Sequence, residues 1–237
     1  MAIEHHPLRA IRTHALDFWL ARASVIVIVG LQLLLGDRVA TGPVWLAPAM
    51  ELVLLAPLSI ATAWAQDLAL KAKADAQWHH VKRRRRAVRM LAVALTGLIT
   101  VINFASLLNV VDALLHGHAG SSGERLLFDA VKIWLINVIA FGLWYWTLDR
   151  GGPAARGLSH HCRPDFLFAQ MTAPGTPDDW SPGFVDYLFL AFTNATAFSP
   201  TDTLPLSGRV KLLMMAQSTI SLLTIALVAA RAVNILA

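Results

Sequence analysis

Long apolar stretches separated by short polar breaks dominate the chain. Apolar stretches of about 20 residues are typical of helices that cross a membrane. Four stretches before residue 149 fit this pattern and are predicted to be spans: 15–36, 44–65, 90–115 and 126–148. Pro48 and Pro57 fall within the second, where neighbouring groups can satisfy the backbone that a proline frees. The pattern therefore predicts an all-α, multi-pass membrane protein.

The order of apolar and polar positions changes after residue 183. An apolar helix is predicted over 184–198, and it reaches only about 22 Å, short of the roughly 30 Å hydrocarbon core. A polar turn with prolines follows over 199–207, and then a long apolar helix over 208–236. Irregular backbone at membrane depth is stable only where protein or a water-filled cavity satisfies it. We therefore expect a re-entrant helix between the fourth span and a fifth one.

The segment TNATAFSPTDTLP, residues 193–205, resembles the TLTTVGYGDITP motif of potassium-channel pore domains. Three residues stand where that family has threonine, aspartate and proline: Thr196, Asp202 and Pro205. The following helix is similar to the family's inner helix. Ser199-Pro200-Thr201 replaces the family's Gly-Tyr-Gly, and proline cannot adopt the left-handed conformation that one of those glycines takes. The resemblance implies a homotetrameric pore architecture that lacks the potassium filter.

Two phrases upstream, LWYWTLDRGGPAAR and PDFLFAQM, resemble those of bacterial membrane proteins related to that pore domain, whose function is not established. The resemblance implies a location in the bacterial inner membrane. We expect two parts, an N-terminal bundle over 1–125 and a pore-like domain over 126–237. In the second part, the outer helix 126–148 leads into a loop over 149–183, whose Ser181 and Pro182 are predicted to open the re-entrant helix.

The composition agrees with a membrane protein, since 56% of residues are hydrophobic and 15% are charged. The net charge of +5 comes mostly from a polar, basic segment over 67–89, which is predicted to be a cytoplasmic loop and does not indicate nucleic-acid binding. Five residues in it are candidates for contact with anionic lipid or a partner: Lys82, Arg83, Arg84, Arg85 and Arg86. Four alternating spans then put loop 149–183 in the cytoplasm, so the re-entrant helix would enter from the face opposite to that used in potassium channels. Trp144, Tyr145 and Trp146 are predicted to form an interfacial aromatic belt.

The polar turn supplies the candidate constriction of a pore. In a symmetric assembly, rings of hydroxyls and carboxylates can select ions without a ladder of carbonyls. The predicted constriction consists of Thr196, Ala197, Phe198, Ser199, Pro200, Thr201 and Asp202. Along the last helix, one face carries the predicted pore lining: Gln217, Ser221, Thr224 and Val228. The alternative for this stripe is that it packs against another helix and no ion passes.

Charged residues inside the spans form a further candidate group. Glu51, Asp112 and Asp129 should lie toward one face of the membrane, where they could form a proton or cation relay. The alternative is that Lys132 pairs with a carboxylate such as Asp129 as a structural contact. His79-His80 and His160-His161-Cys162 lack the spacing of a metal site, so no metal and no cofactor is expected. Because the chain has no phosphate loop, nucleophile elbow or dinucleotide motif, we do not expect an enzyme.

Three functions follow from these patterns. The first is a channel-like membrane protein that is weakly selective for cations. The second is a non-conducting subunit or scaffold that uses the same fold to bind a partner. The third is a membrane protein that binds anionic lipid through the basic segment.

Overall fold

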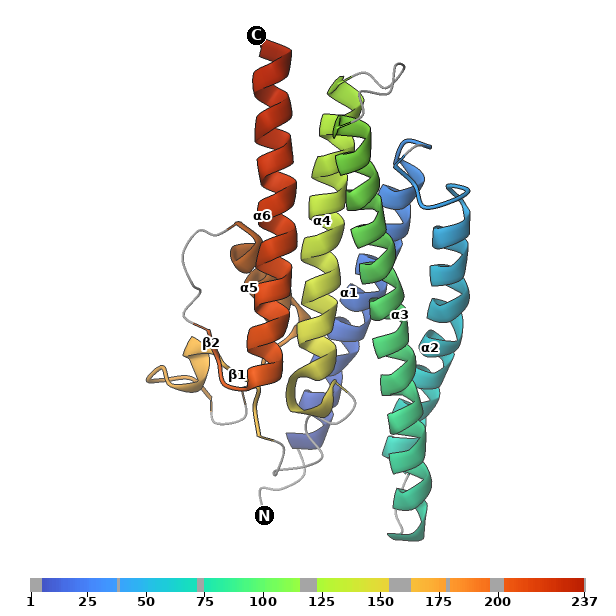
Figure 1. Ribbon diagram of the computed structural model, residues 1–237. Helices are drawn as coiled ribbons and strands as arrows, with labels where there is room; N and C mark the ends of the chain where they lie inside the picture. The colour runs from blue at the N-terminus through green and yellow to red at the C-terminus, as the bar shows by residue number, and fades with distance from the viewer. Residues whose placement is uncertain are drawn as a thin grey trace.

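The computed structural model describes residues 6–37, 39–71, 75–115, 123–153, 163–177, 180–196 and 203–236. Within these ranges, the side chains of 6–15, 60–85, 115, 123 and 231–236 lie outside the described set. Figure 1 shows the long helices running side by side as an elongated bundle, with the shorter α5 against one side of it. The described helices are α1 His6–Leu33, α2 Leu46–Lys71, α3 Asp75–Leu115, α4 Gly123–Leu148, α5 Phe184–Thr196 and α6 Gly208–Leu236.

The predicted all-α class is confirmed. Four described helices, α1, α3, α4 and α6, are long and apolar enough to cross a membrane, which fits a multi-pass membrane protein. The apolar part of α2 whose side chains are described, Leu46–Ser59, is shorter. The remaining elements are two 3-10 turns, η1 Asp149–Gly151 and η2 Ala169–Met171, and two short strands, β1 Phe166–Leu167 and β2 Leu204–Pro205.

The prediction that 67–89 forms a loop is wrong. The backbone of α2 continues to Lys71, and α3 begins at Asp75, so most of the basic segment is helical. Alanine, lysine, arginine and glutamine are strong helix formers, and a polar helix is stable where it projects into water. α3 has 41 residues, and at about 1.5 Å per residue it is roughly twice as long as the hydrocarbon core is thick. Its first turns project beyond the other helices (Figure 1).

α4 lies at the centre of the bundle. Of the residues in its apolar stretch 61% are buried, against 17% in that of α6. The predicted aromatic belt is wrong for two of its three members, because Tyr145 is 0% exposed and Trp146 is 6% exposed. The ring of Trp146 lies 5.4 Å from Phe18 and 5.6 Å from Phe184, both edge to face. The aromatic cluster therefore packs α1 and α5 against α4.

The chain reverses at the end of α4 through two glycines. Gly151 and Gly152 have φ of 80° and 94°, and the Gly152 N–H donates to the Asp149 carbonyl across 2.8 Å. A side chain at Gly152 would begin 2.8 Å from the Thr147 carbonyl oxygen, so only glycine fits. The Gly-Gly pair therefore ends the helical part of the chain that begins with α4.

Two short strands tie the segments before and after α5 together. β1 and β2 are antiparallel, with Phe166 opposite Pro205 and Leu167 opposite Leu204. This pair lies beside the start of α6, near the end of the bundle that also holds η1 and the N-terminus (Figure 1). The chain therefore leaves that end through α5 and has returned to it by Leu204.

Candidate functional site

α5 is the element on which the candidate site depends. It has 13 residues, half the 26 of α4, and so covers only part of the bundle's length. The N–H of Phe184 donates to Oδ1 of Asp17 in α1 across 2.9 Å, and the N–H of Gly183 donates to Oδ2 of Asp186 across 2.8 Å. The predicted opening at Ser181 and Pro182 is wrong, because these two carboxylates cap the helix from Phe184 instead.

The first turn of α5 leaves little room around these carboxylates. A Cβ at Gly183 would lie 3.0 Å from Oδ1 of Asp17. The start of α5 is therefore fixed tightly to α1.

Asp149, at the end of α4, joins the loop to α5. Its Oδ2 accepts from the hydroxyl of Tyr187 across 2.5 Å, and its Oδ1 accepts from the N–H of Asp165 across 2.7 Å. Both Asp149 and Tyr187 are 0% exposed. The Nε of Arg150 lies 3.7 Å from Oδ2 of Asp149. Because an unpartnered buried carboxylate is costly, these bonds fix the position of the loop.

Asp165 extends this connection to α6. Its carboxylate accepts two hydrogen bonds from Arg209, from Nε across 3.0 Å and from Nη2 across 2.5 Å. Burial alone would raise the pKa of Asp165, but the hydrogen bonds and the charge of Arg209 hold it below its usual range. The bidentate geometry is the strong form of such a pair and sets the start of α6 against the loop.

A buried polar network holds the second half of α5 between α4 and α6. Oε1 of Gln217 accepts from the Tyr145 hydroxyl across 2.6 Å and from Nδ2 of Asn194 across 2.8 Å. Nε2 of Gln217 donates to the carbonyl of Ala191 across 2.7 Å, and Ser218 donates to Asn194 across 3.2 Å. Gln217 is 0% exposed. One side chain thus joins three helices.

Three of the four residues predicted to line a pore are buried within the single chain. Gln217, Ser221 and Thr224 are each at most 1% exposed inside a single chain, and Val228 is half-buried. Nδ2 of Asn137 in α4 donates to the Ser221 hydroxyl across 2.8 Å, and Thr224 donates to the Ile220 carbonyl of its own helix. A polar stripe on an apolar helix needs partners, and here α4 and α5 supply them.

The predicted constriction begins at the last residue of α5. Thr196 is half-buried, and its hydroxyl donates to the carbonyls of Phe192 and Thr193 in its own helix, at 3.2 and 3.1 Å. The other six members, Ala197, Phe198, Ser199, Pro200, Thr201 and Asp202, lie outside the described residues. The backbone is described again at Thr203, one residue before β2.

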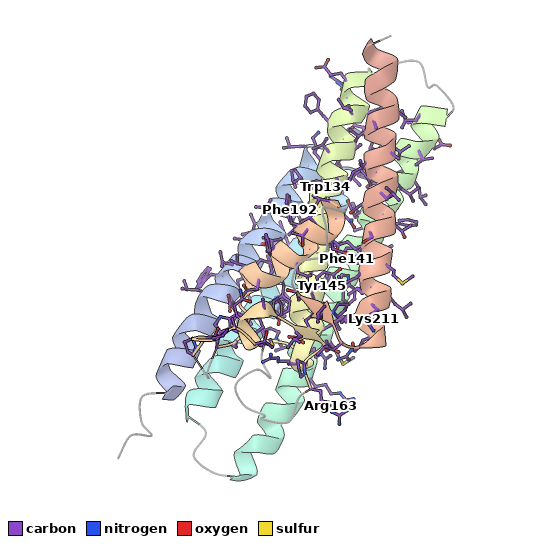
Figure 2. The ribbon with its side chains drawn as sticks, turned by 90° about the vertical axis from the view of Figure 1, so that its left-hand side faces the viewer. Trp134, Phe141, Tyr145, Arg163, Phe192 and Lys211 are labelled. Atoms are coloured by element: carbon purple, nitrogen blue, oxygen red, sulfur yellow. The ribbon has the colours of Figure 1, made fainter. Side chains whose placement is uncertain are left out.

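α5 and α6 present apolar side chains on the outside of the chain. On α6 these are Leu212, Met215, Leu222 and Leu223, and on α5 they are Val185, Phe189 and Phe192, all between 47% and 68% exposed. Phe192 meets Trp134 of α4 edge to face at 5.9 Å, and Figure 2 shows the two rings near the same level of the bundle. The exposed residues of α6 lie on the opposite side of that helix from its buried polar stripe.

The charged residues within the spans have different partners. Nζ of Lys132 lies 2.9 Å from Oδ1 of Asp129 and donates to the Leu34 carbonyl, which confirms the predicted structural pair. Glu51 is 0% exposed and accepts from Nε2 of Gln32 across 2.7 Å. Its Oε2 and the Oε1 of Gln32 have no hydrogen-bond partner among the described residues. The relay that includes Glu51 and Asp112 stays a prediction.

The remaining candidates are placed as follows. Lys82, Arg83, Arg84 and Arg85 belong to the projecting part of α3 but their side chains lie outside the described set, and Arg86 is exposed. Within the described residues, no group of three or more His, Cys, Asp or Glu side chains is placed to hold a metal ion. His79-His80 and His160-His161-Cys162 lie outside the described side chains.

The residues that support α5 were missed by sequence reasoning. Asp17, Tyr145, Asp149 and Asn194 each supply a hydrogen bond that fixes this helix or its loop. The signal for Asp17 and Asn194 was present, because a carboxylate or amide inside an apolar stretch needs a partner.

Comparison of the chain with protein-family models, with curated proteins and with solved structures gives no significant match.

Proposed function

We propose that the protein is a channel-like integral membrane protein of the bacterial inner membrane, weakly selective for cations, which assembles as a homotetramer. α5 would be the re-entrant helix, and residues 196–202 would form the constriction around the symmetry axis. α2 would complete a set of five spans together with α1, α3, α4 and α6. No enzymatic step and no cofactor is part of this proposal.

The observation that carries the proposal is the position of α5. Its N-terminus is capped at one end of the bundle by Asp17, and the chain after it has returned to that end at Leu204, where β2 pairs with β1. A segment of this kind turns back at an intermediate depth, where its irregular backbone needs protein or water around it. Neighbouring copies of the chain, or a water-filled passage between them, would meet that need.

The exposed apolar side of α5 and α6 supports assembly. In the apolar stretch of α6 only 17% of the residues are buried within the chain. The other residues of the stretch can contact lipid or a second copy of the chain. Ala216, Ala226 and Ala230 are exposed on α6 and would let helices approach closely. In the tetramer this side of α6 would contribute both subunit contacts and the wall of the passage, in place of the buried polar stripe.

The conduction proposal is tested by flux into liposomes. Purified protein in vesicles should pass potassium and sodium at similar rates and chloride much more slowly, because Asp202 would form a carboxylate ring. Asp202→Asn should reduce the preference for cations over chloride several-fold. Glu124→Gln, which removes an exposed carboxylate at the start of α4, is the matched control and should leave it unchanged. Absence of flux from correctly folded protein contradicts conduction.

Assembly is tested separately by cross-linking. In a Cys162→Ser background, Leu222→Cys places a thiol on the exposed side of α6. Oxidation in the membrane should give a cross-linked dimer, and a lysine-reactive cross-linker should extend the products to four subunits but no further. A chain that stays monomeric under both treatments contradicts the tetramer.

One observation favours a second function, a non-conducting subunit with the same fold. The polar stripe that would line a conducting pore is buried, and the exposed side of α6 carries mainly apolar side chains. Tetramers that form without any ion flux would support this second function over the first. Ion flux whose preference for cations over chloride falls with Asp202→Asn would exclude it.

A further inference from the structure

The structure holds a cavity of about 330 Å³ between α1, α2, α3 and α4, and its lining does not include Tyr145, Asn194 or Gln217. Its volume lies within the roughly 300 to 1,000 Å³ range of small-molecule sites. The walls are mostly apolar, with Val25, Leu55, Leu95 and Leu143 each contributed by a different helix. Apolar walls of this kind suit an alkyl chain.

Three arginines lie at this cavity: Arg22 of α1 and Arg86 and Arg89 of α3. Arg22 is held in place, because its Nη2 donates to the Ser59 carbonyl of α2 across 3.1 Å and its guanidinium lies over the Trp19 ring at 5.1 Å. The ion pairs among the described residues involve neither Arg86 nor Arg89. The described lining contains no carboxylate. The charge at the cavity therefore favours an anionic group.

The depth of the cavity matches the boundary between headgroups and hydrocarbon. The apolar stretch of α3 begins at Arg86, so Arg86 and Arg89 lie in its first turn. Gly151 and Pro153, which follow the last turn of α4, line the same cavity. Arginines at such a boundary extend their guanidinium groups toward phosphate, while the surface below them meets acyl chains.

We propose that this cavity binds one anionic phospholipid, with an acyl chain between Leu55, Leu95 and Leu143 and the phosphate against Arg86, Arg89 and Arg22. The proposed site is a defined cavity, and it differs from the diffuse attraction of anionic lipids to the basic residues 82–85. It does not depend on whether the protein conducts ions. Guanidinium groups bind phosphate through paired N–H donors, and this chemistry is matched by a phospholipid headgroup inside a membrane.

The test uses delipidated protein in detergent and native mass spectrometry with two lipids that share acyl chains, phosphatidylglycerol and phosphatidylcholine. Phosphatidylglycerol should bind at least about tenfold more tightly than phosphatidylcholine, and Arg86→Gln with Arg89→Gln should remove most of that preference. The matched control, Arg163→Gln with Lys211→Gln, removes two exposed charges that do not line the cavity; Figure 2 labels both residues. An equal loss in both double variants, or no preference between the lipids, would overturn the proposal.

The acyl-chain part of the site is tested by filling the cavity. Ala92→Phe adds a ring where Ala92 lines the cavity, and Ala94→Phe adds the same ring on the exposed side of α3. The first variant should weaken binding of phosphatidylglycerol at least about tenfold, and the second should leave it within about twofold. If inorganic phosphate alone displaces the lipid at equal concentration, or if Ala92→Phe binds as wild type, no acyl chain occupies the cavity and the proposal fails.

Discussion

The hydroxyl of Tyr145 lies 2.6 Å from Oε1 of Gln217, and this hydrogen bond joins α4 to α6 beside the second half of α5. The same oxygen accepts from Asn194, and the amide nitrogen of Gln217 donates to the Ala191 carbonyl. Gln217 therefore satisfies polar groups on all three helices. Its role in the folded chain is to hold α5 in place.

Gln217→Leu should destabilise the protein. The substitution removes the acceptor of the Tyr145 hydroxyl and the side-chain donor to the Ala191 carbonyl, while the Asn194 amide keeps its bond to the Met214 carbonyl. A buried group left unsatisfied costs about 1–3 kcal/mol. Hydrogen bonds in membranes average less, so we expect a total loss of about 1–3 kcal/mol, measured as unfolding in detergent by denaturant or heat. Thr219→Val removes an exposed hydroxyl from the same helix and should change stability by less than about 0.5 kcal/mol. Equal stability of the two variants would contradict this role.

The Asp165–Arg209 pair should make the stability of the protein depend on pH in the acidic range. The folded pKa of Asp165 is lowered, so the pair contributes fully above the carboxylate's unfolded pKa and is lost as pH falls through the folded one. Asp165→Asn should therefore melt lower than wild type at pH 7. Charged hydrogen bonds contribute about 1.5–3 kcal/mol, and solvent around the half-exposed Arg209 reduces that figure here. The difference should shrink as pH falls below the unfolded carboxylate's pKa of about 3.9.

The control for this pH dependence is Lys211→Gln, an exposed cation two residues from Arg209. Its melting temperature should follow that of wild type across the whole pH range. A gap between Asp165→Asn and wild type that does not shrink as pH falls below about 3.9 would mean that the carboxylate's charge is not the source of the stabilisation.

Glu51 should tolerate the loss of its charge and not the loss of its hydrogen bond. Glu51→Gln keeps an oxygen for Nε2 of Gln32, removes a buried carboxylate and should be at least as stable as wild type. Glu51→Leu leaves that donor unsatisfied and should lose about 1–3 kcal/mol in detergent unfolding. If Glu51→Gln abolishes ion flux while the protein stays folded, the carboxylate belongs to a relay; unchanged flux excludes that relay.

The orientation of the chain is predicted by its basic segment. The first turns of α3 project from the same end of the bundle as the N-terminus and β1 (Figure 1), and basic segments stay in the cytoplasm. α5 would then enter from the cytoplasmic face, and the end of α6 would lie outside. Alkaline phosphatase fused after Ala237 should be active, and a fluorescent protein active only in the cytoplasm should be dark. A bright fluorescent fusion would reverse the orientation.

The long helices could be predicted from the sequence because apolar length alone decides them. The last helix was expected over 208–236 and is observed at Gly208–Leu236, where a polar turn precedes an uninterrupted apolar stretch. The helical part of 67–89 was missed because lysine and arginine suit a solvated helix as well as a solvated loop. Local pattern does not separate these two cases.

Which neighbour a polar side chain meets could not be predicted from spacing. The steps from Gln217 to Thr224 correctly indicated a shared face, yet a polar face on an apolar helix fits a water-filled pore and a helix contact equally well. The choice depends on Asn137, Tyr145 and Asn194, which lie between 23 and 84 residues away along the chain. Partners at such separations are set by tertiary packing.

The anchoring of α5 from both sides also sets the order in which the protein can be completed during translation. Asp17 is available early, but Arg209 and Gln217 leave the ribosome only after α5 itself. Until they emerge, the Asp165 carboxylate lacks Arg209 and the Asn194 amide lacks Gln217, so the short helix has only the contacts that α1 and α4 supply. The contacts that hold α5 are thus complete only after α6 has been synthesised.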